Sequence, residues 1–157
     1  MKVGRRGFLG GLAAVAASPV TPGAAQQQRP GGQFVDAPLD ALVSLATKGA
    51  PAPAGRVTLE IPRLADNGHS VAVRVDVTSP MTAVDHVKRI VLLSERNPRP
   101  VIATFHLGPR VGRAEIITRV RLNGTQRVVA VAELSDGSYW SATATVEVTE
   151  SACLDAG

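Results

Sequence analysis

The sequence is poor in cysteine and in aromatic residues. Cys153 is the only cysteine among 157 residues, so the chain has no second thiol with which to form an internal disulfide bond. Aromatic residues make up 3% of the sequence. Nucleic-acid binding relies on stacking platforms or on a strongly basic surface. The shortage of aromatic residues therefore argues against a nucleic-acid partner.

The excess of positive charge is also small once the first residues are set aside. The full chain has 17 Lys and Arg against 13 Asp and Glu, a formal net charge of +4. Lys2, Arg5 and Arg6 lie in the first 25 residues, and without them the balance is 14 against 13, or +1. A nearly neutral protein lacks the charge needed to neutralise phosphates. We therefore expect no nucleic-acid partner.

Motifs for metal binding and catalysis are absent. The three histidines, His69, His86 and His106, have none of the spacings of a metal site, and HExxH, CxxC, GxSxG, phosphate-loop and Rossmann patterns do not occur. Asp85 and His86 are neighbours, but successive residues on a strand point to opposite faces, which argues against a catalytic dyad. We predict that the protein is not an enzyme and holds no metal or cofactor.

The first feature that is present is an export signal. Gly4-Arg5-Arg6-Gly7-Phe8-Leu9 carries paired arginines, and an apolar run follows to Val20. This run has about thirteen residues, whereas a bilayer-spanning helix needs ~20. Residues 1–25 are therefore predicted to be a twin-arginine signal peptide, cleaved after Ala25 or, alternatively, after Ala17. The mature chain would then leave the membrane and enter an oxidising compartment.

The mature chain, about 130 residues, is long enough for one domain with a hydrophobic core. Residues 26–35 are polar and contain Gly and Pro, so we expect a flexible leader. A helix is predicted from Pro38 to about Lys48, capped by Asp36 and ended by Gly49. Its expected apolar face consists of Leu39, Leu42, Val43, Leu45 and Ala46.

From residue 56 onward the apolar residues recur with a period of two, which predicts β-strands. The pattern is clearest at Val71, Val73, Val75 and Val77. Seven strands are expected, at residues 56–61, 71–77, 87–94, 101–107, 113–122, 127–134 and 138–149. Seven short strands with turn signals between them predict an all-β, two-sheet antiparallel sandwich, preceded by one short helix, over residues 36–149.

Two further patterns bear on how the strands are arranged. Asn67-Gly68, Asn123-Gly124 and Asp136-Gly137 lie between expected strands and are typical of tight hairpins, because such turns require positive φ. Residues 128–132 are apolar on both faces of their strand. We expect that strand to be buried twice, in the core and under another element, for which a partner subunit is one candidate. A strand of this kind favours a protein that is not a lone monomer.

Three arginines in expected loops are candidates for binding an anion. Arg96, Arg99 and Arg110 lie beside prolines in segments expected to be loops. Solvated charge is the default interpretation of such residues, and attraction of an anion is the alternative.

Cys153 is the one candidate site residue. The last expected strand ends near Thr149, so residues 150–157 form a C-terminal arm that carries the thiol outside the predicted core. Lone cysteines are usually buried and inert. An exposed thiol is a liability in an oxidising compartment, which favours a functional role. The thiol is free, joined to another molecule, or modified.

Several blocks of the sequence carry a resemblance to a known family. They are Val77-Thr78-Ser79-Pro80-Met81-Thr82-Ala83, His86-Val87-Lys88-Arg89-Ile90, Glu95-Arg96-Asn97-Pro98-Arg99-Pro100, Ala103-Thr104-Phe105-His106 and the long block at residues 125–138. Together with the paired arginines and the helix, they resemble the SoxY family, the sulfur-carrier subunits of the periplasmic Sox thiosulfate-oxidation system.

The resemblance implies an immunoglobulin-like sandwich and a non-catalytic carrier in the periplasm. SoxY proteins form a tight heterodimer with SoxZ, and their C-terminal cysteine, on a mobile arm, holds sulfur intermediates covalently. A haem enzyme, a hydrolase and sulfur-dehydrogenase enzymes dock in turn. The resemblance thus implies that Cys153 is the covalent attachment site, with a SoxZ-like partner and no resident cofactor. A tethered thiol suits this role because tethering raises its concentration at each docked enzyme.

The arm departs from the family pattern Gly-Gly-Cys-Gly-Gly. Here Ser151-Ala152 precede the cysteine and Leu154-Asp155-Ala156-Gly157 follow it. Side chains replace the glycines, and Glu150, Asp155 and the terminal carboxylate add negative charge that disfavours the thiolate and repels anionic sulfur species. Two functions stay open: a sulfur carrier, and a SoxY-like structural or assembly paralogue whose arm carries no sulfur. A disulfide-linked dimer through Cys153 is a third alternative.

Overall fold

The computed structural model describes residues 38–150, which belong to one compact unit. The predicted signal peptide, the leader, the Asp36 cap and Cys153 lie outside the described residues. Helix α1 (Leu39–Thr47) is followed by eight strands. The strands are β1 (Val57–Glu60), β2 (Leu64–Asn67), β3 (Val71–Val77), β4 (Val87–Ser94), β5 (Val101–His106), β6 (Ala114–Val120), β7 (Gln126–Leu134) and β8 (Tyr139–Glu150).

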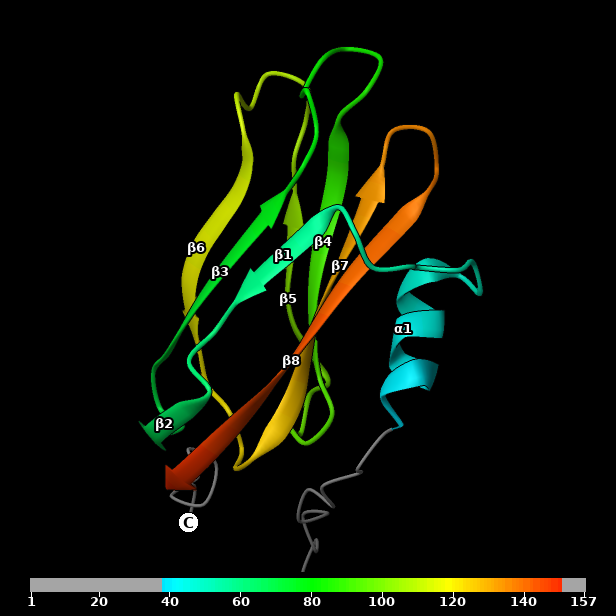
Figure 1. Ribbon diagram of the computed structural model, residues 1–157. Coiled ribbons are helices and arrows are strands. Elements are labelled where there is room, and N and C mark those ends of the chain that lie inside the picture. Colours follow the sequence, from blue (N-terminus) through cyan, green and yellow to red (C-terminus); the bar gives the residue numbers. More distant parts are fainter. Residues whose placement is uncertain (1–37, 151–157) are drawn as a thin grey trace, which may run out of the picture. The chain divides into compact units, whose positions relative to one another are not determined.

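The strands form two sheets stacked into a sandwich (Figure 1). One sheet has the order β1-β3-β6 and the other the order β2-β8-β7-β4-β5. Neighbouring strands are antiparallel except β2 and β8, which run parallel. The predicted all-β immunoglobulin-like sandwich with one short helix is confirmed, and it contains one strand more than the sequence pattern indicated.

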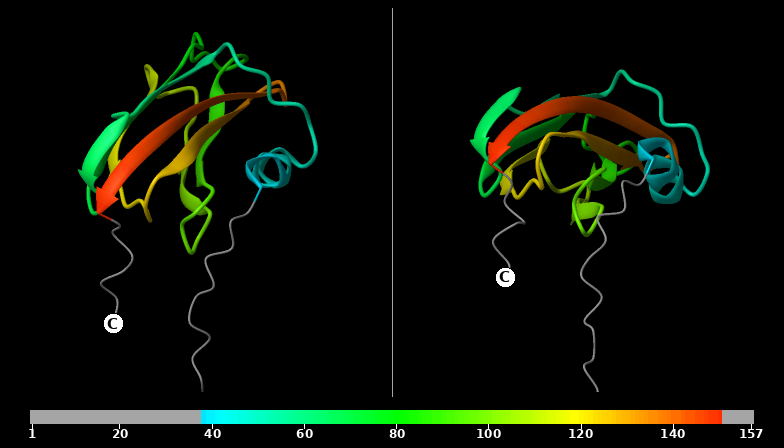
Figure 2. Two further views of the ribbon diagram at one scale, coloured as in Figure 1. Left: turned by 60° about the horizontal axis from the view of Figure 1, so that its bottom comes forward. Right: turned by 90° about the horizontal axis from the view of Figure 1, so that it is seen from below.

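The additional strand is β2. Of its four residues only Ala65 is buried, so the segment shows no period-two pattern that would predict a strand. It forms because it pairs with the end of β8, where Leu64 lies opposite Glu147 and Asn67 opposite Glu150. Figure 2 shows β8 running from the side of α1 to β2.

The main core lies between the two sheets and is rich in valine. Val71, Val73, Val75 and Val77 of β3 are each at most 2% exposed and belong to this core. Alternate residues of β7, beginning with Val128, pack in the same cluster. The period-two pattern therefore identified the inward face of β3 correctly.

Helix α1 covers the outer face of β7. Val129 and Val131 pack against Leu39 and Leu42 of the helix in a second apolar cluster, separate from the main core. The expected double burial of this strand is confirmed. Because the cover is the chain's own helix, the apolar strand indicates neither a partner subunit nor a protein that is more than a monomer.

The sequence predicted that Leu45 lies on the buried face of α1. This prediction was wrong. The side chain of Leu45 is 78% exposed. At 3.6 residues per turn, Leu45 lies about 110° around the helix axis from the middle of the face formed by Leu39, Leu42, Val43 and Ala46. The buried stripe is therefore narrower than the sequence prediction, and Leu45 points to solvent.

Only one of the three predicted hairpin turns joins paired strands. Asp136-Gly137 connects β7 and β8, which are antiparallel neighbours, and Gly137 has a φ of 84°. Asn67-Gly68 and Asn123-Gly124 instead lie where the chain passes from one sheet to the other, before β3 and before β7. The hairpin prediction was wrong at these two positions, because a turn sequence does not say which sheet the next strand joins.

Candidate functional site

The carboxyl end of β8 is the part of the described structure closest in sequence to the predicted site. β8 has twelve residues and ends at Glu150, three residues before Cys153. This strand end lies beside β2, as Figures 1 and 2 show.

Two backbone hydrogen bonds in series fix the last residue of β8. The N–H of Gly68 donates to the carbonyl oxygen of Glu150 (2.7 Å), and the N–H of Leu122 donates to the carbonyl oxygen of Gly68 (2.8 Å). Gly68 follows β2 and Leu122 follows β6, so the strand end is attached to the ends of two other strands.

A side chain also holds the last residues of this strand in place. Thr125 lies just before β7, and its Oγ1 accepts the backbone N–H of Val148 (3.0 Å). One residue earlier, the N–H of Glu147 donates to the carbonyl oxygen of Arg63 (2.8 Å). Backbone groups that β7 leaves unpaired at the end of β8 are therefore satisfied, as buried or half-buried backbone groups must be.

The loop that carries Thr125 is stabilised by a partly buried polar network centred on Asn97. The Oδ1 of Asn97 accepts from the N–H of Asn123 (2.9 Å) and from Nε2 of Gln126 (3.1 Å), and its Nδ2 donates to the carbonyl oxygen of Arg121 (2.8 Å). Gln126 is 2% exposed. Sequence reasoning missed this network, because isolated amide residues carry no periodic signal.

Exposed carboxylates lie at the end of β8 and on β2 beside it. Asp66 on β2 and Glu147 and Glu150 on β8 are all exposed, and the two strands are paired along this stretch. The structure thus adds Asp66 and Glu147 to Glu150 at the end of β8. Nearby carboxylates disfavour a thiolate and repel anions.

The predicted loop arginines do not form one group. Nη1 of Arg96 donates to the carbonyl oxygen of Thr125 (3.0 Å), which is a structural role. Arg110 lies in the loop between β5 and β6, at the other end of these strands from Arg99. Arg99 lies in a surface hollow beside the start of β5, together with Arg119 and Arg121.

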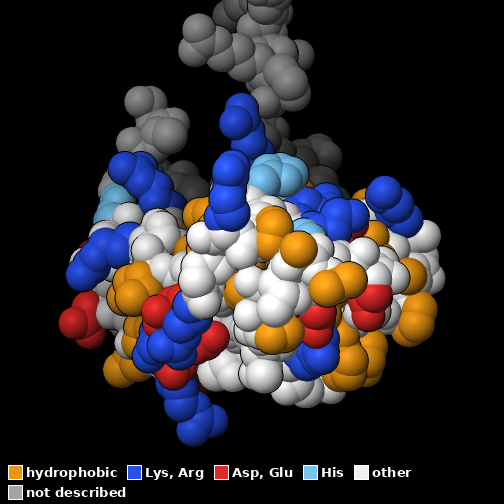
Figure 3. Space-filling model, turned by 90° about the horizontal axis from the view of Figure 1, so that it is seen from above, with side chains coloured by type: hydrophobic (Ala, Val, Ile, Leu, Met, Phe, Trp, Pro, Cys, Tyr) orange, Lys and Arg blue, Asp and Glu red, His pale blue; other side chains and the backbone are white. Residues whose placement is uncertain are grey.

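Two of the three histidines come together, although not at the end of β8. His86 and His106 line a hollow of about 520 Å³ with Lys48, Lys88 and Glu133. Figure 3 looks onto this end of the molecule, where Lys and Arg side chains lie both beside the His side chains and among the Asp and Glu side chains. His69 is exposed in the loop after β2. Within residues 38–150 no group of three or more His, Cys, Asp or Glu could hold a metal ion.

The neighbours Asp85 and His86 have separate partners. Nδ1 of His86 donates to the carbonyl oxygen of Thr82 (3.1 Å), since a carbonyl can only accept. The backbone N–H of Asp85 donates to Oγ1 of the same threonine (3.0 Å). These contacts shape the segment before β4.

Glu133 is the acidic residue of the hollow that His86 and His106 line. Its carboxylate accepts from Nζ of Lys88 (3.1 Å) and pairs with Nη2 of Arg89 (2.9 Å). Partial burial would raise the pKa of Glu133, but the hydrogen bonds and positive charges of Lys88 and Arg89 outweigh burial and lower this pKa below its ordinary value. Arg89 also donates to the carbonyl oxygen of Ala46 (3.0 Å), which joins α1 to the sheet.

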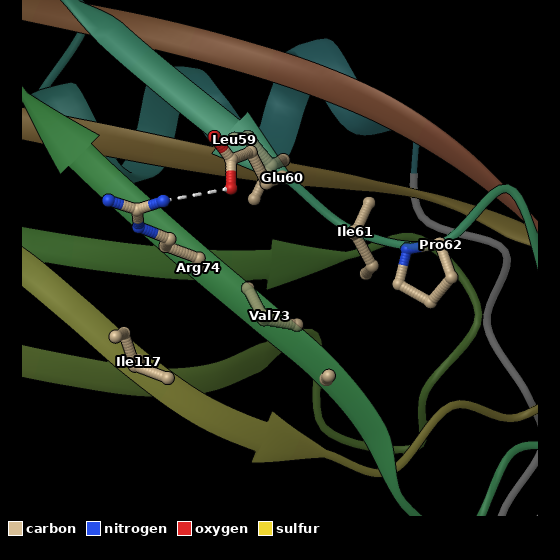
Figure 4. Close-up of a pocket in the computed structure, with 8 residues that line it drawn as sticks. Leu59, Glu60, Ile61, Pro62, Val73, Arg74 and Ile117 are labelled. Atoms are coloured by element: carbon tan, nitrogen blue, oxygen red, sulfur yellow. Dashed lines mark hydrogen bonds and ion pairs between the residues drawn. The ribbon is translucent and has the colours of Figure 1, made fainter.

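A third hollow, of about 470 Å³, lies on the three-stranded sheet (Figure 4). Its charged members are Glu60 and Arg74, which pair at 3.3 Å, and Arg74 also donates to Glu115 (2.6 Å). Ile117 adds an exposed apolar side chain. Because the charges satisfy each other, this hollow offers no free group for chemistry.

Comparison with known proteins identifies the family. The family described as "Sulfur oxidation protein SoxY" matches residues 44–153. The chain belongs to the SoxY family. Membership supports a role in sulfur oxidation, and the family is in general periplasmic, with Sox-system partners such as SoxZ. No helix within residues 38–150 of this SoxY-family chain has the length and apolarity to cross a membrane.

Solved structures share the fold. The sulfur carrier protein SoxY from Chlorobium limicola f thiosulfatophilum matches with a TM-score of 0.59 and 24% identity, over 73% of this chain and 95% of that chain. A superoxide reductase (neelaredoxin) from Ignicoccus hospitalis matches with a TM-score of 0.54 and 18% identity, over 60% and 80% of the two chains. No curated protein sequence matches. At these identities, the structural likenesses show the fold alone.

Proposed function

We propose that this protein is an exported, periplasmic sulfur carrier that holds thiosulfate-derived sulfur covalently on Cys153. The observation that carries the proposal is the family match over residues 44–153, which runs through the sandwich and includes Cys153. Cys153 follows the anchored end of β8 by three residues. Three residues span at most about 11 Å, so the thiol is presented near this end of the sandwich.

Loading the carrier is an oxidation. The Cys153 thiol and thiosulfate form an S–S bond, giving Cys–S–S–SO₃⁻ and releasing one proton and two electrons. The electrons need an acceptor, and we assign this role to a haem enzyme partner of the Sox type. Hydrolysis of the terminal S–S bond by one water then releases sulfate and two protons and leaves Cys–S–S⁻ on the carrier.

The chain itself contributes presentation instead of catalysis. Gly68 and Thr125 hold the last residues of β8 against the sandwich, so the segment after Glu150 starts from a fixed point. A tether of fixed origin raises the effective concentration of the thiol at a docked enzyme. Heterodimerisation with a SoxZ-like subunit and export by the twin-arginine route belong to the proposal, and family membership supports them.

A second function has an observation in its favour. The exposed carboxylates Asp66, Glu147 and Glu150 disfavour a reactive thiolate, and the residues that replace the family's glycines reduce the backbone freedom that the family's arm sequence provides. These features suit a structural or assembly paralogue that carries no sulfur.

Intact-mass measurement separates the two functions. The mature protein is incubated with thiosulfate and the Sox haem enzyme, and a carrier gains the mass of one S₂O₃ unit. The Cys153→Ala variant gains none. An unchanged mass for the wild-type protein, or an equal gain in the variant, would show that Cys153 is no carrier.

A further inference from the structure

A hollow of about 460 Å³ lies where β5 begins and β6 ends. Three of its lining residues are Arg99, Arg119 and Arg121, and no Asp or Glu is among the described residues that line it. Val101 and Ile102 from β5 add apolar side chains to its lining. The hollow therefore combines concentrated positive charge with a surface that excludes part of the solvent.

The charge of this arginine hollow is not neutralised within the described residues. The ion pairs of residues 38–150 involve other basic side chains, and none of them includes Arg99, Arg119 or Arg121. Nη1 of Arg119 donates to the carbonyl oxygen of Ser70 (3.3 Å) and to its Oγ (3.2 Å). These bonds orient the guanidinium and leave its charge uncompensated.

The arginine hollow lies close to the anchored end of β8. Arg121 precedes Leu122, whose N–H bonds to Gly68, and the N–H of Gly68 bonds to Glu150. Arg119 contacts Ser70, two residues after Gly68 in the same loop. The loop of residues 68–70 therefore touches the hollow on one side and the start of the C-terminal segment on the other.

We propose that the arginine hollow binds the sulfo group, –SO₃⁻, of the cargo carried on Cys153. The covalent source of this group rests on the proposed function, whereas free sulfate or thiosulfate offers the same chemistry. Guanidinium groups match tetrahedral oxyanions because they present parallel N–H donors in a fixed plane. Asn97, through its bond to the carbonyl oxygen of Arg121, holds the backbone of that residue in place.

A weak site is sufficient for this role. Exposed charge pairs are worth little individually, so the hollow binds a free anion weakly. A sulfo group on the same chain, however, has an effective concentration in the millimolar range, which favours the bound state without a new contact. Binding in the hollow also takes the anionic cargo away from Asp66, Glu147 and Glu150.

The first arm of the test uses free sulfate and the Cys153→Ala protein. Backbone amide shifts are followed by NMR during a sulfate titration at constant ionic strength set with chloride. The backbone amides of Asn97, Arg99, Val101 and Ile102, and those of residues 119–121, are expected to shift. Arg121→Gln weakens binding about fivefold, equivalent to about 1 kcal/mol. The matched control Arg110→Gln removes the same charge at the other end of β5 and β6 and leaves binding unchanged. Equal weakening by both variants, or shifts spread over the whole surface, overturns the site.

The second arm tests the covalent source. Tetrathionate converts the Cys153 thiolate to Cys–S–S–SO₃⁻, because the thiolate attacks a sulfane sulfur and thiosulfate leaves with the electron pair. In the loaded wild-type protein, the same amides are expected to shift without added sulfate and independently of protein concentration. In the Arg99→Gln/Arg121→Gln protein, this shift is expected to be lost, while the positions of the other amide signals are unchanged. If the amide signals of the hollow do not shift in the loaded wild-type protein, the cargo assignment is overturned. Failure of the haem enzyme to load the thiol contradicts the proposed function and leaves the sulfate arm valid.

Discussion

Oγ1 of Thr125 accepts the backbone N–H of Val148 at 3.0 Å, two residues before β8 ends. The hydroxyl stands in for a strand neighbour, because β7 begins only at Gln126. Thr125 thereby joins the loop organised by Asn97 to the strand that leads to Cys153.

Replacing Thr125 by Val removes the acceptor while keeping the shape of the side chain. We expect the unfolding free energy to fall by about 1 kcal/mol, because the N–H of Val148 loses its partner. Hydrogen exchange of the Val148 amide should become faster. The matched control Thr125→Ser keeps the acceptor and should protect this amide as the wild-type protein does. Equal exchange in the Val and Ser variants would show that the hydroxyl does not hold the strand end.

Ser94 provides a test of the core. Ser94 is 0% exposed. Its Oγ is buried and has no hydrogen-bond partner among residues 38–150. Removing an unsatisfied buried hydroxyl is expected to be neutral or to raise the unfolding free energy by up to about 1 kcal/mol. Urea unfolding of Ser94→Ala measures this.

Ser141→Ala is the matched control for that measurement. Oγ of Ser141 donates to the carbonyl oxygen of Ala52 (2.7 Å), so its loss leaves an acceptor unpaired. We expect a decrease of about 1 kcal/mol in the unfolding free energy. A larger decrease for Ser94→Ala than for Ser141→Ala would contradict the assignment of Ser94 as unsatisfied.

The attachment of α1 to the sheet predicts opposite behaviour for two leucines of one helix. Leu42 is 9% exposed and packs in the cluster over β7, whereas Leu45 is 78% exposed. Leu42→Ala should lower the unfolding free energy by about 2 kcal/mol, since it removes buried methyl groups. Leu45→Ala should change it by less than about 0.5 kcal/mol. Similar losses in urea unfolding for both variants would mean that Leu45 packs against something in solution.

Glu133 makes stability depend on pH. Because its pKa is lower in the folded protein than its ordinary value, ionised Glu133 stabilises the fold above the unfolded-state pKa. This stabilisation is lost as the pH falls through the folded-state pKa. We expect Glu133→Gln to lower the unfolding free energy by roughly 1 kcal/mol at neutral pH, and the difference from wild type to vanish in acid. Denaturant unfolding at a series of pH values measures both.

Glu60→Gln is the control for the pH experiment. The side chain of Glu60 is 60% exposed in its pair with Arg74, so its removal should cost little at any pH. A difference between Glu133→Gln and wild type that stays constant down to acid pH would contradict the role assigned to the charge of Glu133.

The valine alternation at Val71, Val73, Val75 and Val77 predicted the buried face of β3, because a strand with one side in the core leaves a period of two in the sequence. The apolar stretch at residues 128–132 predicted the double burial of β7, because a strand that is covered on both faces is apolar at every position. Neither pattern shows what covers a face, so α1 was not recognised as the cover. Strand β2 left no signal, since its pairing with β8 depends on backbone groups.

The candidate site was less accessible from sequence than the fold. Cys153 could be singled out because it is the only cysteine and follows the last strand. The gathering of Arg99, Arg119 and Arg121 into one hollow could not, because it depends on the start of β5 meeting the end of β6. Of the three arginines singled out in the sequence, only Arg99 lies there. Residues far apart in the chain become neighbours only when the sheet order is known.

Covalent carriage on Cys153 is tested most directly by mass spectrometry of the C-terminal peptide. The protein is loaded with thiosulfate and the Sox haem enzyme, digested without reductant, and the peptide that contains Cys153 is fragmented. We expect an S₂O₃ unit on the sulfur of Cys153, which a reductant removes. A C-terminal peptide that still carries a free thiol after loading, or an adduct on any other residue, would contradict it.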